Sequence, residues 1–230
     1  MFRNKAFAIT AFILAIIFFA FALRMYHAST TLMWGDEGFS VFSASRDLYA
    51  ITFEGKDVDP HPPFYYYLFH FWMLLSGTSN LAIRFFSIFF GTATVAIVYT
   101  LGRKFFSPRV GIVSAALFAL APFAVQYSQE VRMYALVMFL GALTFYVLSK
   151  LLDRETRSRW ILFFVSMFLT QYSLYQSAFL FVAQGIFLLP FLKTRFRFIL
   201  KWLGGSIAIV LLFLPWLALH STSAFTDIKD

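Results

Sequence analysis

The sequence of 230 residues contains no cysteine and few charged residues. Without cysteine the chain can form no disulfide, no thiolate metal site and no cysteine nucleophile. Charged residues make up 13% of the chain, whereas 60% is hydrophobic and 21% aromatic, and the mean hydropathy is +0.75. A water-soluble domain of this length could bury only part of so much apolar surface. The composition therefore predicts an integral membrane protein and argues against a cytosolic globular one.

Apolar runs between charged breaks give the candidate membrane spans. There are seven of them, at residues 6–23, 81–101, 110–127, 133–149, 160–174, 177–192 and 202–219. The first run is longer than the roughly 7 to 15 apolar residues of a secretory signal, so we expect it to remain as an anchor. Residues 160–192 could form one span or two, and basic residues at both ends favour a hairpin of two helices. We therefore expect an all-α membrane protein, a polytopic bundle of about seven transmembrane helices that forms a single module over residues 1–230.

Basic residues collect on alternate connections between these runs. With the N-terminus inside, the inner segments carry 13 of the 19 lysines and arginines, whereas nine of the 11 acids and all four histidines lie on the outer side. This asymmetry follows the positive-inside rule and predicts a cytoplasmic N-terminus. The net charge of +8 is then explained by membrane orientation, and we expect no binding of nucleic acid.

The outer loop of residues 24–80 is too long to be a simple connection. Its segment 63–76 is strongly apolar, but at about 1.5 Å per residue it would reach only some 20 Å as a helix. We expect it to form an interfacial helix along the membrane surface, with the rings of residues 65–67, 70 and 72 at the headgroup boundary. A short tilted span would reverse every later loop, which the charge distribution disfavours.

The first polar cluster of the outer side is the acidic pair Asp36 and Glu37. Adjacent carboxylates in a membrane-facing cleft can accept a proton or hold a cation, so both are candidate catalytic residues. The alternative is that they only begin a surface helix.

The second cluster is built around His61, which follows Asp57 and Asp59 and precedes two prolines. Proline fixes the backbone, so the imidazole is presented rigidly at the start of the interfacial helix. An imidazole beside carboxylates can bind a phosphate, relay a proton or ligate a metal. The alternative is a turn that merely starts the helix.

The third cluster is the segment 127–134, which lies at the outer turn between the third and fourth runs. Arg132 has the planar fork that suits a phosphate, although it could instead pair with Glu130 or with lipid headgroups. Arg84 is a further candidate phosphate contact, with snorkelling to headgroups as its alternative. All three clusters emerge on one membrane face, and together they suit a substrate that is half lipid and half anion.

These motifs resemble a known family in their order along the chain. They are "DE" at residues 36–37, "D-x-HPPFYY" at 59–66, "LAIRFFS" and "LGRKFF" across the second run, and "YSQEVRMYAL" at 127–136. The pattern resembles bacterial membrane glycosyltransferases of the GT-C type, related to protein O-mannosyltransferases and to the lipid A aminoarabinose transferase. The resemblance covers residues 1 to about 150 by motifs and the remainder by span pattern.

The resemblance implies transfer of a sugar from a polyprenyl-phosphate donor to a lipid, glycan or protein hydroxyl on the outer face of the cytoplasmic membrane, with inversion. It makes Asp36 the general base and Glu37 its assistant. The donor phosphate would be held by His61, Arg132 and Arg84.

The remaining site residues complete this expectation. Tyr127, Glu130 and Tyr134 are expected to bind substrate. Related transferases carry "EKPP" where this chain has "PHPP", and Asp59 with His61 is the pair that could hold a divalent metal ion. Family members usually continue after the seventh helix, so we expect this chain to be the N-terminal catalytic module without the family's C-terminal part.

Two other functions remain open from the sequence. A transporter or flippase would be expected to carry charges at mid-membrane, which these runs lack. A non-catalytic module that binds polyprenyl phosphate or scaffolds a partner is the second alternative.

Overall fold

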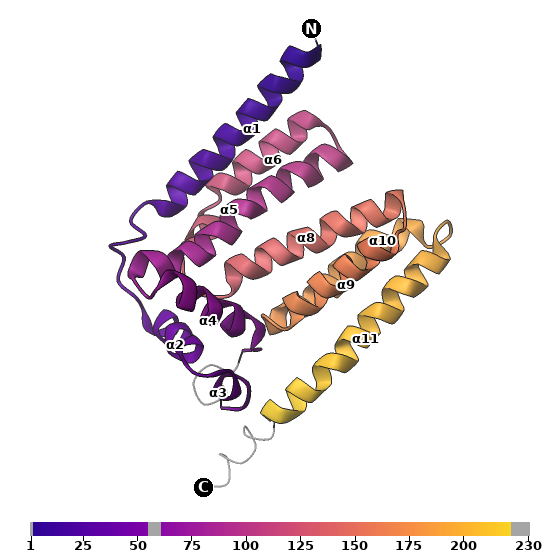
Figure 1. The fold of residues 1–230 in the computed structure, drawn as a ribbon. Coiled ribbons are helices and arrows are strands. Elements are labelled where there is room, and N and C mark those ends of the chain that lie inside the picture. The colour runs from indigo at the N-terminus through magenta and orange to yellow at the C-terminus, as the bar shows by residue number, and fades with distance from the viewer. Residues whose placement is uncertain (1, 55–60, 222–230) are drawn as a thin grey trace.

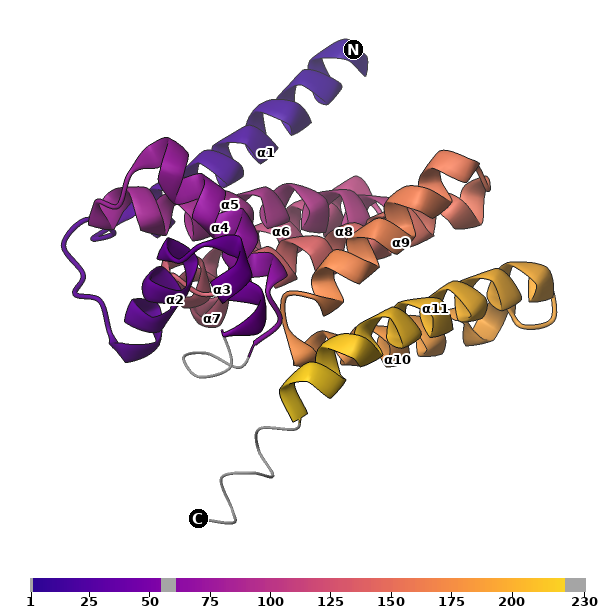
Figure 2. The same ribbon diagram turned by 60° about the horizontal axis from the view of Figure 1, so that its bottom comes forward.

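The computed structural model describes residues 2–54 and 61–221, and in these ranges all regular structure is helical. The prediction of an all-α fold is therefore confirmed. Figure 1 shows α1 (Phe2–Met25) on one side of the bundle and α11 (Phe196–Ser221) on the other, and Figure 2 shows the same separation.

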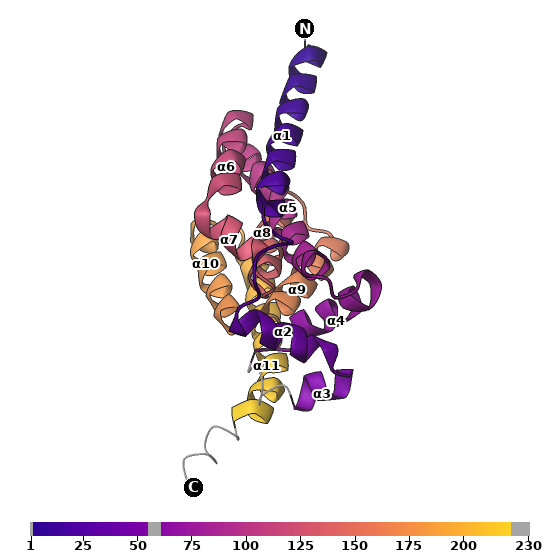
Figure 3. The ribbon, with the colours of Figure 1, turned by 90° about the vertical axis from the view of Figure 1, so that its left-hand side faces the viewer.

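The middle of the bundle is built from helical hairpins. It contains α5 (Asn80–Phe105), α6 (Pro108–Leu120), α7 (Pro122–Gln129), α8 (Tyr134–Asp153), α9 (Arg157–Gln171) and α10 (Phe179–Leu188), with 3₁₀ turns η2 (Tyr175–Ala178) and η3 (Leu189–Phe191). Three shorter helices, α2 (Gly35–Ser45), α3 (Leu48–Phe53) and α4 (Phe64–Ser76), gather at one end of the bundle, as Figures 1 and 3 show. We call this the α2–α4 end. The turns α5–α6, α8–α9 and α10–α11 lie at the opposite end.

Four helices in the described residues are long and apolar enough to cross a membrane: α1, α5, α8 and α11. The pair α6 and α7 makes a fifth candidate, although the two are bent by 56° relative to each other. The apolar run 110–127 therefore forms two helices with a break between them, at Pro122, which has no N–H to continue the α6 ladder. The predicted count of seven is not confirmed. The predicted hairpin within residues 160–192 is present, but α9 has 15 residues and α10 has 10, short of a full crossing.

Small residues let the first hairpin pack closely. A Cβ on Gly111 would lie 2.6 Å from the carbonyl oxygen of Tyr99, so only glycine fits where α6 meets α5. In the second half, the fully buried Gln184 of α10 donates to Thr144 Oγ1 (3.0 Å) and to Met167 Sδ (3.2 Å) and accepts from Trp202 Nε1 (3.2 Å). One amide thus joins α10 to α8, α9 and α11.

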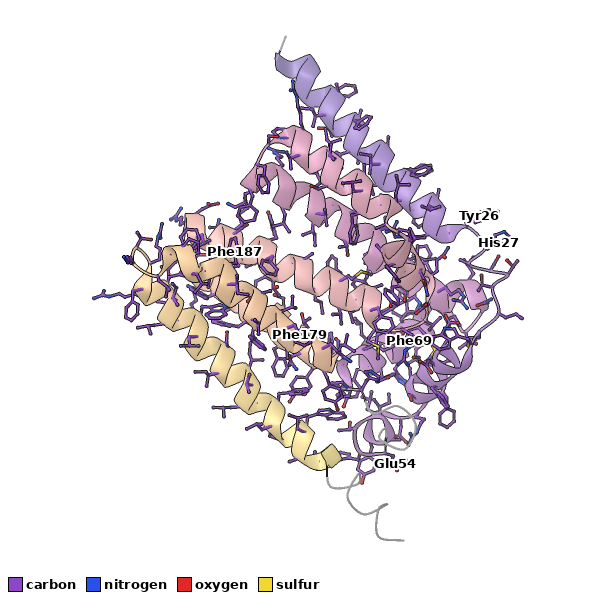
Figure 4. All side chains as sticks on the ribbon, turned by 180° about the vertical axis from the view of Figure 1, so that it is seen from behind. Tyr26, His27, Glu54, Phe69, Phe179 and Phe187 are labelled. Carbon is purple, nitrogen blue, oxygen red and sulfur yellow. The ribbon has the colours of Figure 1, made fainter. Side chains whose placement is uncertain are left out.

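The predicted interfacial segment does form a helix, α4, directly after the prolines. Two of its rings differ from expectation, because Tyr65 and Tyr66 are buried within the protein, Tyr65 against Phe86 of α5. The rings of residues 67, 70 and 72 are only partly buried. Figure 4 shows Phe69 at the α2–α4 end, with Phe179 and Phe187 along α10. The buried face of α4 packs on α5 and α8 at the end of the bundle, and this packing removes the rings of Tyr65 and Tyr66 from the surface.

Candidate functional site

Glu37, in the first turn of α2, is buried with only 1% of its surface exposed. Its two oxygens receive the guanidinium of Arg84, at 2.6 Å for Oε1–Nη1 and 2.8 Å for Oε2–Nη2. Oε1 also accepts from the backbone N–H of Val131 (2.8 Å), and Oε2 from that of Trp34 (3.3 Å). Four hydrogen bonds thus hold the Glu37 carboxylate in one position.

Arg84, in the second turn of α5, is equally enclosed. Its Nε donates to Asn80 Oδ1 (3.0 Å), and Nη1 donates to the carbonyl of Gln129. Nη2 points at the carbonyls of Thr31 and Leu32, at 3.4 and 3.3 Å. All three guanidinium nitrogens therefore have acceptors in the protein. The structure places Arg84 in the framework of the site, where it joins the α1–α2 connection, α2, α5 and the end of α7.

Asp36 differs from its neighbour, because its side chain is only partly buried. Among the hydrogen bonds of the described residues, none reaches its carboxylate. Its backbone carbonyl accepts from Arg132 Nη1 (3.1 Å) and from Ser40 Oγ (3.1 Å). Two adjacent carboxylates thus have opposite surroundings, one saturated with donors and one accessible.

Arg132 comes from the turn between α7 and α8, and it is 4% exposed. Besides the Asp36 carbonyl, its Nη1 donates to Ser40 Oγ (3.0 Å). Glu130, in the same turn, caps the end of α7 and accepts from Gln126 Nε2 (3.0 Å). The rings of Tyr127 and Tyr134 flank this turn with centroids 4.7 Å apart. The structure therefore brings the first and third clusters together, as the sequence predicted.

His61 lies beside η2, with its ring centroid 6.3 Å from that of Tyr175. The hydroxyl of Tyr175 accepts from Trp216 Nε1 of α11 (3.1 Å). Asp59, the other half of the predicted metal pair, falls outside the described residues. Within the part of the chain that the structure describes, no group of three or more metal-binding side chains is found, so the metal site stays a prediction.

Two apolar cavities open near this end of the bundle. One, of about 450 Å³, lies between α8 and α10 and includes Val137, Gly141 and Ser177 in its walls. The other, of about 370 Å³, lies between α4 and α11 and includes Tyr67 and Trp216. Both could receive hydrocarbon, since their walls are largely apolar.

Sequence reasoning missed Arg24, which it placed in the outer loop. The helix α1 instead continues to Met25, and Arg24 in its last turn is fully buried. Its position directly after the apolar run 6–23 could have indicated its burial, because an arginine at the end of a membrane helix needs polar partners within the protein.

The helical membrane bundle, with an acidic pair in a short helix after the first span, has the fold of the GT-C class of membrane glycosyltransferases. The chain belongs to the dolichyl-phosphate-mannose-protein mannosyltransferase family, whose model matches residues 60–218. This match includes the segments 61–66 and 127–134 but begins after Asp36 and Glu37.

A solved structure from Saccharomyces cerevisiae, the protein O-mannosyltransferase Pmt1–Pmt2 complex bound to the sugar donor, shares the fold with a TM-score of 0.73 and 18% sequence identity. The similarity covers 94% of this chain but 34% of the yeast chain, so this chain spans about a third of that protein's length. No curated protein matches the sequence.

Proposed function

We propose that the protein transfers a sugar from a polyprenyl-phosphate carrier to a hydroxyl group, and that the reaction takes place at the α2–α4 end. The observation that carries this proposal is the contrast within the acidic pair. Asp36 keeps an accessible carboxylate, and its backbone carbonyl is held by Arg132, whereas the carboxylate of Glu37 is paired with Arg84. The family description makes a polyprenyl-phosphate-linked hexose the first donor to test.

In this mechanism the acceptor hydroxyl attacks the anomeric carbon while Asp36 accepts its proton. The new bond joins the acceptor oxygen to the sugar, and the bond between the anomeric carbon and the phosphate oxygen breaks with inversion. The leaving group departs as polyprenyl phosphate, an anion that needs cationic neighbours. We assign that task to Arg132 and His61.

Two residues that the sequence analysis expected to contact the substrate are better suited to positioning other residues. Glu37 and Arg84 are enclosed and saturated with partners, so we assign them to positioning the first turn of α2 and the α7–α8 turn. Tyr127, Tyr134 and Glu130 flank that turn and are assigned to substrate binding. We assign the two apolar cavities near this end to binding the isoprenoid chain of the donor.

The decisive test is transfer of label from polyprenyl-phosphate sugars in reconstituted vesicles. Asp36→Asn removes the base at nearly constant shape and should lower the transfer rate by about 10²-fold or more. Glu54→Gln, an exposed acid at the same end, is the matched control and should retain the rate. Undiminished transfer by Asp36→Asn would remove this residue from the mechanism, and donor binding without transfer by the wild type would indicate a binding module.

We also propose that the protein resides in the cytoplasmic membrane with the α2–α4 end outside. The cysteine-free chain allows single labels at the exposed Ser45, in α2, and Ser158, at the opposite end. A membrane-impermeant thiol reagent should label Ser45→Cys in intact cells and Ser158→Cys only after permeabilisation. The reverse pattern would invert the proposed orientation.

A further inference from the structure

The bend between α6 and α7 meets the end of α1 through one buried arginine. Arg24 donates from Nε to Ser128 Oγ of α7 (3.1 Å) and from Nη1 to the Ala119 carbonyl of α6 (3.2 Å). A third bond, from Nη1 to the Ala20 carbonyl (3.1 Å), ties the guanidinium to its own helix. The same guanidinium therefore touches both sides of the break at Pro122.

The chemistry of the break explains why a cation is accommodated there. The last carbonyls of α6 lose their helical donors where the chain bends, and they form the negative end of that helix. Among the ion pairs of the described residues, none joins Arg24 to an acidic side chain, and its Nη2 makes no hydrogen bond. The charge is thus held by the end of a broken helix and by hydroxyl and carbonyl oxygens.

The contact is reciprocal, because α7 also holds the end of α1. Gln129 Nε2 donates to the carbonyls of Arg24 (3.2 Å) and Tyr26 (3.0 Å). Gln129 in turn offers its own carbonyl to Arg84, and Val131 donates to Glu37. A displacement of α7 would therefore also move Arg84 and Glu37, which hold the first turn of α2.

Gly91 of α5 makes the space for this junction. A Cβ at position 91 would lie 2.0 Å from Ser128 Oγ, 2.6 Å from Ser128 Cβ and 3.3 Å from Arg24 Nε. Such contacts are impossible without moving Ser128, which is also tied to the Ala124 carbonyl. Glycine at this position allows α7 to approach α5 directly beside Arg24.

We propose that Arg24 is a positioning residue that, with the gap at Gly91, sets the α6–α7 bend and thereby the position of the turn that carries Arg132. The relevance to catalysis rests on the proposed function, whereas the bend itself can be measured independently. Spin labels at the exposed positions Val110 in α6 and Phe123 in α7 report the bend. Labels at Val110 and Phe89 in α5 report the α5–α6 hairpin as a control.

Arg24→Met should shift or broaden the 110–123 distance distribution by several ångströms and leave the 110–89 distribution unchanged. Gly91→Ala should produce the same shift while Arg24 is intact. Gly204→Ala, where an added Cβ has nothing within 4 Å, is the matched control and should change neither pair. An unchanged 110–123 distribution in either variant would overturn the proposal, and so would equal broadening of both pairs in Arg24→Met.

The transfer assay separates this proposal from the proposed function. In Arg24→Met, kcat should fall at least tenfold, because the turn that carries Arg132 is misplaced when the leaving phosphate has to be stabilised. If the wild type shows no transfer, the proposed function fails, yet the distance measurements still decide whether Arg24 sets the bend. A raised KM with unchanged kcat would contradict the positioning role.

Discussion

The buried ion pair at the α2–α4 end differs from the exposed ion pairs at the opposite end. At the α2–α4 end, Glu37 and Arg84 pair almost completely out of solvent. At the opposite end, Lys104 pairs with Asp153 and Lys201 with Glu155, and in each pair one side chain is more than half exposed. The free-energy cost of removing a buried pair from water has to be offset by further hydrogen bonds. Here Glu37 accepts from the backbone N–H of Val131, and Arg84 donates to the backbone carbonyls of Gln129 and Leu32. We infer that the buried pair fixes the local geometry, and we expect the exposed pairs to contribute little to stability.

Breaking the buried pair should give the largest effect. Arg84→Ala leaves Glu37 as an uncompensated buried anion, so the free energy of unfolding should fall by about 3–5 kcal/mol. Thermal unfolding of the detergent-solubilised protein measures this. Glu54→Gln breaks the exposed Arg46–Glu54 pair at the same end and should cost less than about 1 kcal/mol. Equal losses for both variants would show that burial does not distinguish the pairs.

A lysine at position 84 tests the geometry of the pair separately from its charge. Arg84→Lys keeps a cation beside Glu37 but cannot donate in parallel to both carboxylate oxygens while reaching Asn80. We expect a loss of about 1–3 kcal/mol, between those of the alanine variant and the exposed pair. Full retention of thermal stability in this variant would mean that charge alone suffices.

At the opposite end, Lys104→Gln should change stability by less than about 1 kcal/mol. Because the Lys104–Asp153 pair is exposed to solvent, the small difference from wild type should shrink further as salt is raised from 0.01 to about 1 M. The Arg84→Ala loss should persist over the same range. A large salt-insensitive loss in Lys104→Gln would place this pair in the same class as the buried one.

The smallest expected effect is the pH response of Glu155. The hydrogen bond from Lys201 lowers the pKa of the Glu155 carboxyl below its usual value. A lowered pKa in the folded state means that the carboxylate stabilises the fold above pH 4.5 and that this stabilisation is lost as the pH falls through the folded-state pKa. Glu155→Gln should therefore flatten the stability profile slightly below pH 4.5. An identical profile in wild type and variant would show that the pair contributes nothing.

The sequence predicted the parts of this fold that depend on local pattern. Apolar runs located the long helices but not α2 and α3. Two prolines located the start of α4, and the basic connections located the turns of the opposite end. The convergence of residues 36–37 with 127–134 followed from topology. The pairing of Glu37 with Arg84, 47 residues apart, could not be predicted, because it depends on how α2 packs against α5. The residue pattern alone made both Asp36 and Glu37 candidate catalytic residues, whereas packing encloses Glu37 and leaves Asp36 partly exposed.

The buried amide of Gln184 has a consequence for biosynthesis. A helix that carries an unpaired amide is poorly accommodated among lipid chains, and α10 is also short for a full crossing. Its hydrogen-bonding partners come from α8, α9 and α11, of which the last is synthesised after it. The second half of the bundle should therefore settle in the membrane as a cooperative unit, in which α10 reaches its stable position only once Trp202 has left the ribosome.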